Sequence, residues 1–142
     1  MAHDLKQGKS GIQLRNIVLL ESIYRMTNFD NLPKVENLVM HVSLANNITD
    51  AKIDVHVKVT VQEVDNENFI IDVTMAGVFV KENPVPFSND QFIKVNGPAI
   101  VYPYVRQHIR TLTLESGIPP ILLPVYNFAA IANKNQETDG DN

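Results

Sequence analysis

The side chains that could act in acid–base catalysis or bind a metal ion are few and widely spaced. The chain has four histidines, His3, His41, His56 and His108. None has a second histidine two residues away, the spacing for paired ligands on a strand, or three to four residues away, the spacing on a helix. Asp54 and His56 share one face of a predicted strand, but a solvated strand face explains the pair more simply than a dyad. The sequence therefore predicts no metal site and no catalytic dyad.

Motifs for covalent catalysis and phosphate binding are missing as well. The chain has no cysteine, which excludes disulfides, thiolate catalysis and thiolate metal sites. Its six glycines form no phosphate-binding loop, and no Gly-x-Ser-x-Gly motif is present. Ser88 and Ser116 are interpreted as helix-end residues. We expect a protein that is not an enzyme and that needs no cofactor.

Composition narrows the class of protein further. The chain has 142 residues, of which 44% are hydrophobic and 20% charged, and its net charge is -4. This size suits one domain with one core. A mildly acidic chain without basic runs is not expected to bind nucleic acid or an anionic membrane. No stretch is long and apolar enough to span a bilayer, and residues 1–10 lack the apolar core of a secretory signal, so a cytoplasmic location is predicted.

Hydrophobic periodicity predicts a single α+β domain over residues 12–132. It lies between a disordered lead-in (residues 1–11) and a disordered acidic tail (residues 133–142). Four strands are predicted at residues 12–25, 35–44, 53–61 and 69–80. Their short connections favour a four-stranded antiparallel meander. Residues 12–25 are apolar on both faces, which is typical of a central or doubly covered strand.

A long broken helix is expected to cover one face of this sheet. It should open near Ser88, be broken or bent at Gly97-Pro98, and continue from residue 99 to about residue 116. Pro103 would then fall in the first turn of the second section. The predicted apolar stripe of that section consists of Val101, Val105, Ile109 and Leu112. Ile70, Val78 and Val80 leave the other face of the fourth strand partly apolar, and self-association would cover them.

The helix is followed by an unusually apolar loop, residues 118–128, which we call the apolar loop. Its large apolar residues are Ile118, Ile121, Leu122, Leu123, Val125, Tyr126 and Phe128. Three prolines stiffen it, so that its side chains would lose little entropy on binding. Such a loop either packs on its own sheet as core or forms one wall of a groove for extended segments of other chains.

A family resemblance favours the second interpretation. Tyr102-Pro103-Tyr104-Val105-Arg106 resembles the Phe-Pro-Tyr-Ala-Arg motif of the SecB export chaperones. Pro124-Val125-Tyr126-Asn127-Phe128 is similar to the Pro-Val-Asn-Phe end of that family's helix-connecting loop, and Gly77-Val78-Phe79 to its Gly-Ile-Phe. The resemblance covers most of the chain, from about Ile12 to Phe128.

The resemblance implies an ATP-independent holdase and no catalysis. Unfolded or export-bound polypeptides would bind in an apolar groove lined by the seven residues of the apolar loop given above. The family assembles as a homotetramer, a dimer of dimers, and delivers its clients to the SecA translocase. The positions that match its SecA-contacting patch are Glu21, Ile70 and Asp72.

Departures from the family pattern leave other interpretations open. Arg25 stands at a second acidic position of the family, Tyr126 is an insertion, the usual tryptophan is missing, and the second long helix is nearly absent. The first alternative is a dedicated SecB-like chaperone of an antitoxin in a toxin–antitoxin system. Two alternatives from other classes are a small acyl-thioester enzyme and a purely structural oligomerisation domain.

Overall fold

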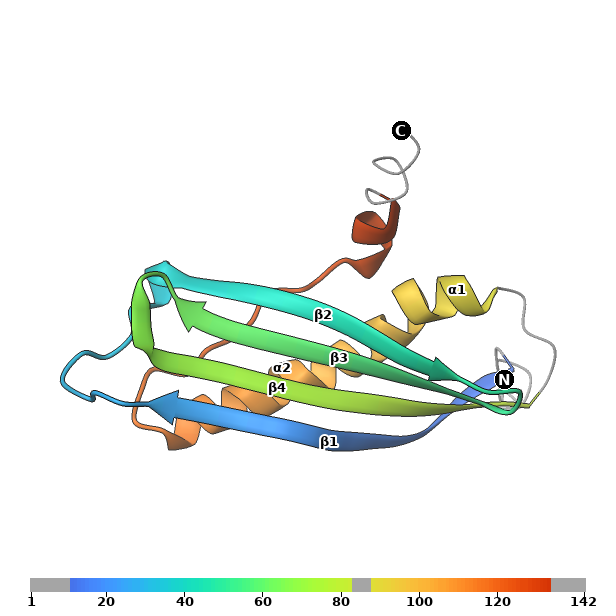
Figure 1. Cartoon of the computed structure of the whole chain (residues 1–142), viewed down its shortest axis with the longest axis horizontal. Coiled ribbons are helices and arrows are strands. Elements are labelled where there is room, and N and C mark those ends of the chain that lie inside the picture. Colours follow the sequence, from blue (N-terminus) through green and yellow to red (C-terminus); the bar gives the residue numbers. More distant parts are fainter. Residues whose placement is uncertain (1–10, 83–87, 134–142) are drawn as a thin grey trace, which may run out of the picture.

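Four antiparallel strands form one sheet, and helical segments lie on one of its faces (Figure 1). The structure is a computed structural model, which describes residues 11–82 and 88–133. The strands are β1 (Ile12–Met26), β2 (Leu38–Ile48), β3 (Lys52–Glu63) and β4 (Asn66–Lys81). This arrangement confirms the predicted α+β fold. The lead-in and the tail that were predicted to be disordered lie almost entirely outside the described residues.

The strand order departs from a simple meander at β1. The order is β1-β4-β3-β2, so β2, β3 and β4 are neighbours as predicted, whereas β1 pairs with β4 at an edge. Of the two alternatives predicted for residues 12–25, a central or a doubly covered strand, the central position is therefore wrong. Two register shifts, between Leu14 and Asn16 and between Leu19 and Glu21, reverse the alternation of the side chains. Apolar residues thus fall on both faces of a strand that lies at the edge.

The centre of the core comes from β3. Its apolar residues are at most 1% exposed and comprise Ile53, Val55, Val57, Val59 and Val61. Across the antiparallel ladder, Val59 lies opposite Val73 and Ile53 opposite Phe79 of β4, both of which are buried. Unbroken alternation predicted this strand, because successive side chains of a strand point to opposite faces.

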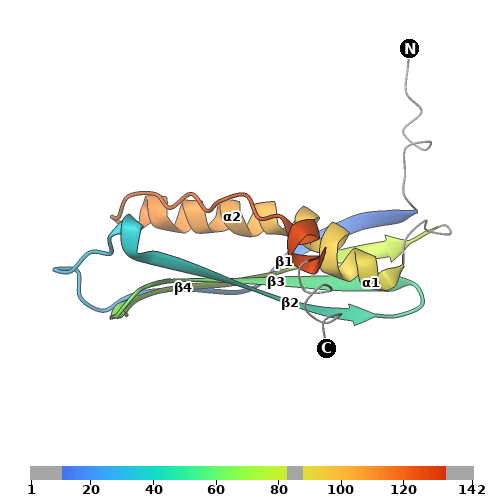
Figure 2. The same cartoon turned by 90° about the horizontal axis from the view of Figure 1, so that it is seen from above.

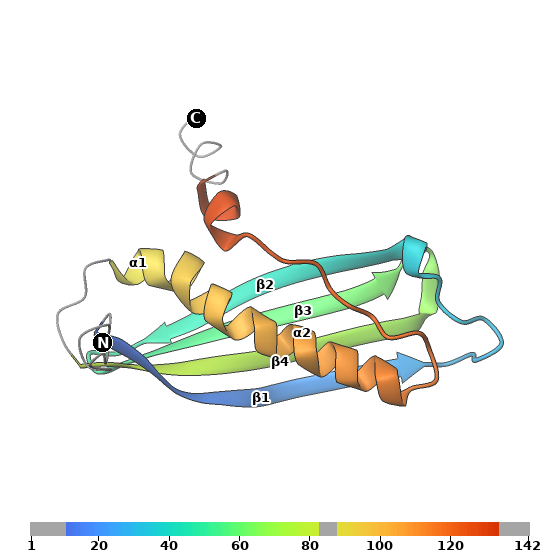
Figure 3. The ribbon, with the colours of Figure 1, turned by 180° about the vertical axis from the view of Figure 1, so that it is seen from behind.

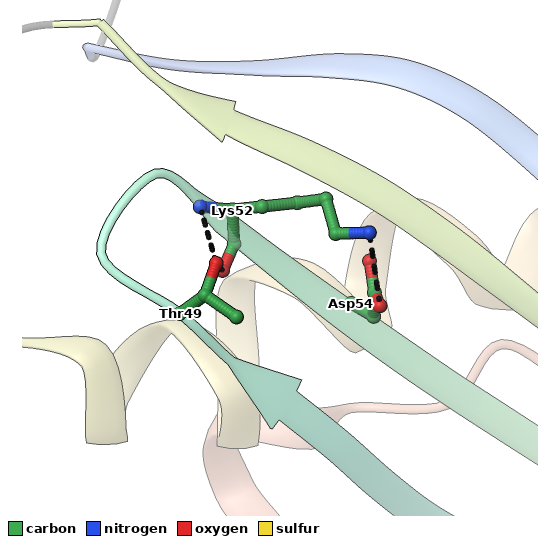
Figure 4. A network of polar contacts seen from close by, with 3 residues as sticks. All are labelled: Thr49, Lys52 and Asp54. Atoms are coloured by element: carbon green, nitrogen blue, oxygen red, sulfur yellow. Dashed lines mark hydrogen bonds and ion pairs between the residues drawn. The ribbon is translucent and has the colours of Figure 1, made fainter.

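A short turn sets the register of β2 against β3 (Figure 4). The Thr49 N–H donates to the Lys52 carbonyl at 2.8 Å, and the Lys52 N–H donates to the Thr49 hydroxyl oxygen at 3.1 Å. The Lys52 ammonium also lies 3.6 Å from the Asp54 carboxylate. In this register Met40 pairs with Val61, and every second residue of β2 shares the core-facing side, as predicted.

A helical segment crosses the sheet on one side (Figure 2). It comprises α1 (Asn89–Gln91), a π-helical turn η2 (Phe92–Asn96) and α2 (Gly97–Glu115). The Ser88 hydroxyl oxygen accepts the Gln91 N–H at 3.1 Å, which confirms the predicted N-terminal cap. The interruption predicted at Gly97 takes the form of the π turn just before it. The helix runs on through this turn, so Pro103 lies inside α2. The prediction that it lies in a first turn is therefore wrong.

Close packing holds α2 against the sheet. Val101, Val105 and Ile109 are fully buried, which confirms most of the predicted stripe, and a positive φ of 85° at Gly117 follows the end of the helix. At Gly77 of β4 the approach is so close that a Cβ atom would lie 2.6 Å from the Val101 side chain. No helix within residues 11–82 and 88–133 has the length and apolarity needed to cross a bilayer.

The opposite face of the sheet, which we call the outer face, is not covered by any described segment (Figure 2). Polar residues of β3 such as Lys58 and Thr60 lie on it. Beside them, Ile70, Val78 and Val80 of β4 are half-buried. The outer face is therefore mixed in polarity, as the sequence predicted.

Adding one methyl group at Gly77 is expected to destabilise the fold by about 1–3 kcal/mol. In Gly77→Ala the new carbon would meet Val101 at 2.6 Å and the Phe79 ring at 2.8 Å, so α2 or the ring must shift. Urea unfolding of the variant and the wild type measures the cost. Equal unfolding free energies would show that α2 does not depend on this close approach.

Acid is expected to loosen the contact between the β1–β2 connection and the β3–β4 hairpin. Glu63 accepts hydrogen bonds from the Lys34 backbone N–H and, at 2.6 Å, from the Asn66 amide. These bonds hold the pKa of Glu63 below its usual 4.5. Because the folded-state pKa is the lower one, the stabilisation is present above the unfolded value and is lost as the pH falls through the folded value.

Urea unfolding of the wild type and of Glu63→Gln from about pH 6 to about pH 3 tests this linkage. The wild type should be the more stable protein near pH 6, and the difference should shrink as the carboxylate is protonated. A difference that stays constant over this range would contradict the assignment.

Candidate functional site

The apolar loop returns along α2 toward α1, on the same face of the sheet as the helix (Figure 3). Figure 2 shows it in the helix layer, so that α2 and the loop lie side by side above the strands. Tyr102 of α2 connects the loop to β2, because its hydroxyl lies 2.6 Å from the Pro124 carbonyl oxygen and 3.7 Å from the Met40 sulfur. The loop therefore forms part of the cover over the core.

Burial divides the seven predicted client-binding residues into two groups. The buried group belongs to the core of this subunit and comprises Ile118, Ile121, Leu123 and Phe128. By contrast, Leu122 is 64% exposed and Val125 is 85% exposed, while Tyr126 is half-buried. One side of the loop is thus core, as in the first interpretation, and the other side is an exposed apolar surface.

A buried hydroxyl fastens the beginning of the loop. Thr113 is fully buried on α2, and its Oγ1 donates to the Arg110 carbonyl at 3.0 Å and accepts the Ile121 N–H at 2.9 Å. A buried backbone N–H without a partner would be costly, so this bond satisfies a group that the loop would otherwise leave unpaired. Sequence analysis missed Thr113, although one signal was present: it is a polar residue four positions beyond Ile109 on an apolar stripe.

Three aromatic rings fasten the end of the loop. The ring centroids of Tyr102 and Phe128 lie 5.8 Å apart, and those of Tyr126 and Phe128 lie 4.8 Å apart. Burial raises the pKa of Tyr102, so at neutral pH its phenol keeps the proton that it donates to Pro124. Beyond Phe128 the chain forms a short helical turn, and Asn127 caps it by accepting the Ala130 N–H at 3.0 Å.

The edge strand β2 also exposes apolar side chains on the side of the sheet that carries the helix layer. Leu44 and Ile48 are 42% and 38% exposed, although their partners Val57 and Ile53 on β3 are fully buried. They lie on the core-facing side of an edge strand. The alternation of β2 does not reveal this exposure, because nothing in the strand pattern shows that α2 covers β3 and β4 more fully than β2.

The three predicted partner-contact residues come together on the outer face. Ile70 and Asp72 are two residues apart on β4, and Glu21 of β1 pairs with the next residue of that row, Thr74. Lys58 lies 3.5 Å from Asp72 and partly neutralises it. Arg25 pairs directly with Ile70, so a cation also borders the patch.

The histidines take no part in a catalytic or metal site that the structure shows. His108 of α2 lies 2.8 Å from the Ser22 hydroxyl of β1. Asp54 pairs with Lys52 (Figure 4), but only 17% of its side chain is exposed and His56 is half-buried, so the strand face interpreted as solvated is only partly solvated. Among residues 11–82 and 88–133, no three metal-binding side chains of the His, Cys, Asp or Glu type gather in one place. His3 lies outside the described residues.

Two polar hollows lie elsewhere on the molecule. One of about 550 Å³ is at the β3–β4 hairpin and includes Arg25 and Glu67 in its lining. Another of about 450 Å³ lies between α1 and the helical turn after Phe128, where Lys94 and Ala132 line it. Neither is lined by the exposed residues of the apolar loop, so the loop remains the candidate site.

Comparison with known proteins agrees with this arrangement. The family model described as preprotein translocase subunit SecB matches residues 20–139. The protein-export protein SecB of Neisseria meningitidis serogroup B is 36% identical over 111 residues, which cover 75% of this chain and 74% of that protein. The SecB of Methylobacillus flagellatus is 39% identical over 85 residues, and the match spans 54% of its length.

A solved structure shares the fold. The SecB-like chaperone of Mycobacterium tuberculosis, determined in complex with a peptide from the HigA1 antitoxin, superposes with a TM-score of 0.67 at 18% identity. The match covers 82% of this chain and 88% of that one. SecB is a family of chaperones and not of enzymes. From the family model and these relatives together, we conclude that the chain belongs to the SecB family of protein-export chaperones.

Proposed function

We propose that this protein is an ATP-independent holdase, which keeps unfolded or export-bound polypeptides in a non-native state in the cytoplasm. One observation carries the proposal: in a chain of the SecB family, the apolar loop exposes 64% of Leu122 and 85% of Val125 while its backbone is fastened to α2. An apolar surface on a fixed backbone loses little entropy when another chain binds to it.

Burial refines the list of residues that would touch a client. We assign contact with clients to Leu122, Val125 and Tyr126. The other four predicted residues, which are buried, would hold the loop in place. Burying one large apolar side chain contributes roughly 1.5–3 kcal/mol, whereas association costs on the order of 4–15 kcal/mol. Several contacts must therefore act together, and Leu44 of β2 is a candidate for the groove floor.

Self-association would supply a longer binding surface. The edge strand β1 exposes several large apolar residues, namely Leu14, Leu19, Leu20 and Ile23. Leu14 and Leu19 pair with the core-side residues Phe79 and Met75, whereas Ile23 pairs with Asp72 on the outer face, so these residues lie on both faces of β1. A two-fold interface along this edge would bury apolar residues from both faces on both copies at once. We propose that the protein is a homo-oligomer, with the dimer of dimers of its family as the expected assembly.

The outer face is the proposed site of transfer to the SecA translocase. Glu21, Ile70 and Asp72 lie in adjacent rows of β1 and β4, so one partner could contact all three. Arg25 beside Ile70 favours a partner that carries an acidic group at that position.

A second client class deserves a direct test because of one comparison. The solved chaperone from Mycobacterium tuberculosis carries a peptide of an antitoxin, and its fold matches most of this chain. If the protein is instead a dedicated antitoxin chaperone, the same loop would hold a segment of one antitoxin. Binding to many unrelated unfolded proteins would favour the general holdase, and tight binding to one antitoxin alone would favour the dedicated chaperone.

Removing the exposed side chains of the apolar loop is expected to weaken holdase activity. In Leu122→Ser combined with Val125→Ser, two apolar contacts of roughly 1.5–3 kcal/mol each are lost and the core is untouched, so affinity for an unfolded client should fall roughly 10²- to 10⁴-fold. The measurement is the concentration of protein that suppresses aggregation of a denatured client without ATP.

The matched control is Val64→Ser, which removes a 57% exposed side chain from the β3–β4 hairpin. It should suppress aggregation as well as the wild type does. Unchanged suppression by the double variant, with light scattering and circular dichroism also unchanged, would refute the assignment of the loop.

Neutralising the acidic residues of the outer face is expected to weaken SecA binding alone. Each exposed charge pair contributes about 0.5–1 kcal/mol, so Glu21→Gln, which removes an exposed carboxylate, should reduce affinity about two- to fivefold. The Asp72 side chain is only 15% exposed and is paired with Lys58, so Asp72→Asn should reduce affinity less. Titration of purified SecA by calorimetry measures the change, with Asp50→Asn in the exposed β2–β3 turn as a control away from the patch. Two results would contradict the proposed separation of the two surfaces: variants that lose client holding, or variants that bind SecA as tightly as the wild type does.

A further inference from the structure

We infer that Tyr102 and Thr113 are positioning residues that clamp the apolar loop in a single register, so that the side chain of Leu122 faces outward for binding. The inference rests on the proposed function, because Leu122 is the residue that it presents to a client. The two hydrogen bonds from these residues to the loop, to Ile121 and to Pro124, are together called the clamp.

The clamp grips both ends of a four-residue segment. At one end Thr113 Oγ1 accepts the Ile121 N–H at 2.9 Å, and at the other the Tyr102 hydroxyl donates to the Pro124 carbonyl at 2.6 Å. Both side chains come from α2 and are at most 4% exposed, so packing fixes their positions. Between the two bonds lies Leu122, with 64% of its surface exposed.

Hydrophobicity alone does not select this arrangement. Ile121, Leu122 and Leu123 are three consecutive aliphatic residues of similar size. Ile121 and Leu123 are 7% and 4% exposed, so the segment alternates in the manner of an extended strand. A slip by one residue would bury Leu122 and expose its neighbours at little apolar cost, as in a strand whose register is poorly specified. Hydrogen bonds depend on the position of backbone groups, so the clamp distinguishes the two registers.

The neighbouring prolines support the clamp but do not replace it. Pro119 and Pro120 precede the segment and Pro124 ends it, and their fixed φ angles narrow the conformations of the loop. A proline has no N–H, so it cannot supply the bond that Ile121 makes. The specific restraint on register therefore comes from Tyr102 and Thr113.

Two nearly isosteric variants remove the clamp without emptying the core. Thr113→Val deletes the acceptor of the Ile121 N–H, and Tyr102→Phe deletes the donor to Pro124. Matched controls are Thr111→Val and Tyr104→Phe, which make the same changes on exposed or half-buried turns of α2. The Thr111 hydroxyl oxygen accepts a hydrogen bond from the Gln107 amide of the same helix, at 3.5 Å.

A double-mutant cycle then tests whether the clamp acts through Leu122. The probe is reduced, carboxymethylated α-lactalbumin, which stays unfolded, and its dissociation constant is measured by fluorescence anisotropy. Tyr102→Phe with Thr113→Val should weaken binding about five- to twentyfold in the wild-type background. In a Leu122→Ser background the same pair should change binding less than about twofold, because the positioned group is already gone. The control variants should leave binding unchanged.

Equal weakening in both backgrounds would overturn the inference, as would no weakening in either. If the wild type does not bind the unfolded probe at all, the proposed holdase function fails. The existence of the clamp is then tested by a measurement that needs no client. Amide hydrogen exchange of Ile121 should then accelerate in Thr113→Val and not in Thr111→Val. Unchanged exchange at Ile121 would refute the clamp itself.

Discussion

The close approach of α2 to the centre of the sheet is the constraint on which the other parts of the structure depend. A Cβ atom at Gly77 would lie 2.6 Å from Val101, and one at Gly97 would lie 2.7 Å from Val55. The helix therefore lies directly on β3 and β4 and leaves the side of the core toward β2 open. The apolar loop covers that opening, with residues such as Leu123 packed into the core. Because the loop covers the core with one side only, a short irregular segment so rich in aliphatic residues cannot bury every aliphatic side chain. Its other side is therefore exposed and apolar.

Sequence reasoning was strongest where one local pattern decides the outcome. Strict alternation identified β3, and the residues of its predicted stripe placed α2 on the sheet. It failed at β1, because the bulge after Leu19 shifts the side chains by one residue and makes an edge strand resemble a central one. For the site, the choice between core and binding surface could not be made, because Leu122 and Leu123 are identical residues with opposite environments. Their environments differ because the segment that contains them is hydrogen-bonded, through Ile121 and Pro124, to Thr113 and Tyr102 of α2. The loop sequence itself does not reveal these bonds.

The two proposed functions would thereby be separated onto opposite faces of one sheet. The apolar side chains proposed to hold a client lie in the helix layer, whereas the acidic and apolar patch around Asp72 lies on the outer face. The alternation of the strands links the two faces, because Ile71 is buried in the core and Asp72 beside it lies on the outer face. Each face can thus vary in composition while the other keeps its packing, which is consistent with the departures from the family pattern at Arg25.

The π-helical turn η2 has a consequence for how this chain can tolerate changes in length. Phe92 packs edge-to-face on Phe79, with ring centroids 4.9 Å apart. Five positions separate Phe92 from Gly97, which lies against the sheet, but four separate Gly97 from Val101, which also lies against it. The wide turn thus accommodates one surplus residue in the helix. Natural deletion of a single residue there would restore an ordinary α-helix and keep both aromatic and aliphatic contacts aligned. The same deletion one turn later would rotate Val105 and Ile109 away from the sheet, so evolutionary indels in this helix should gather at the π turn.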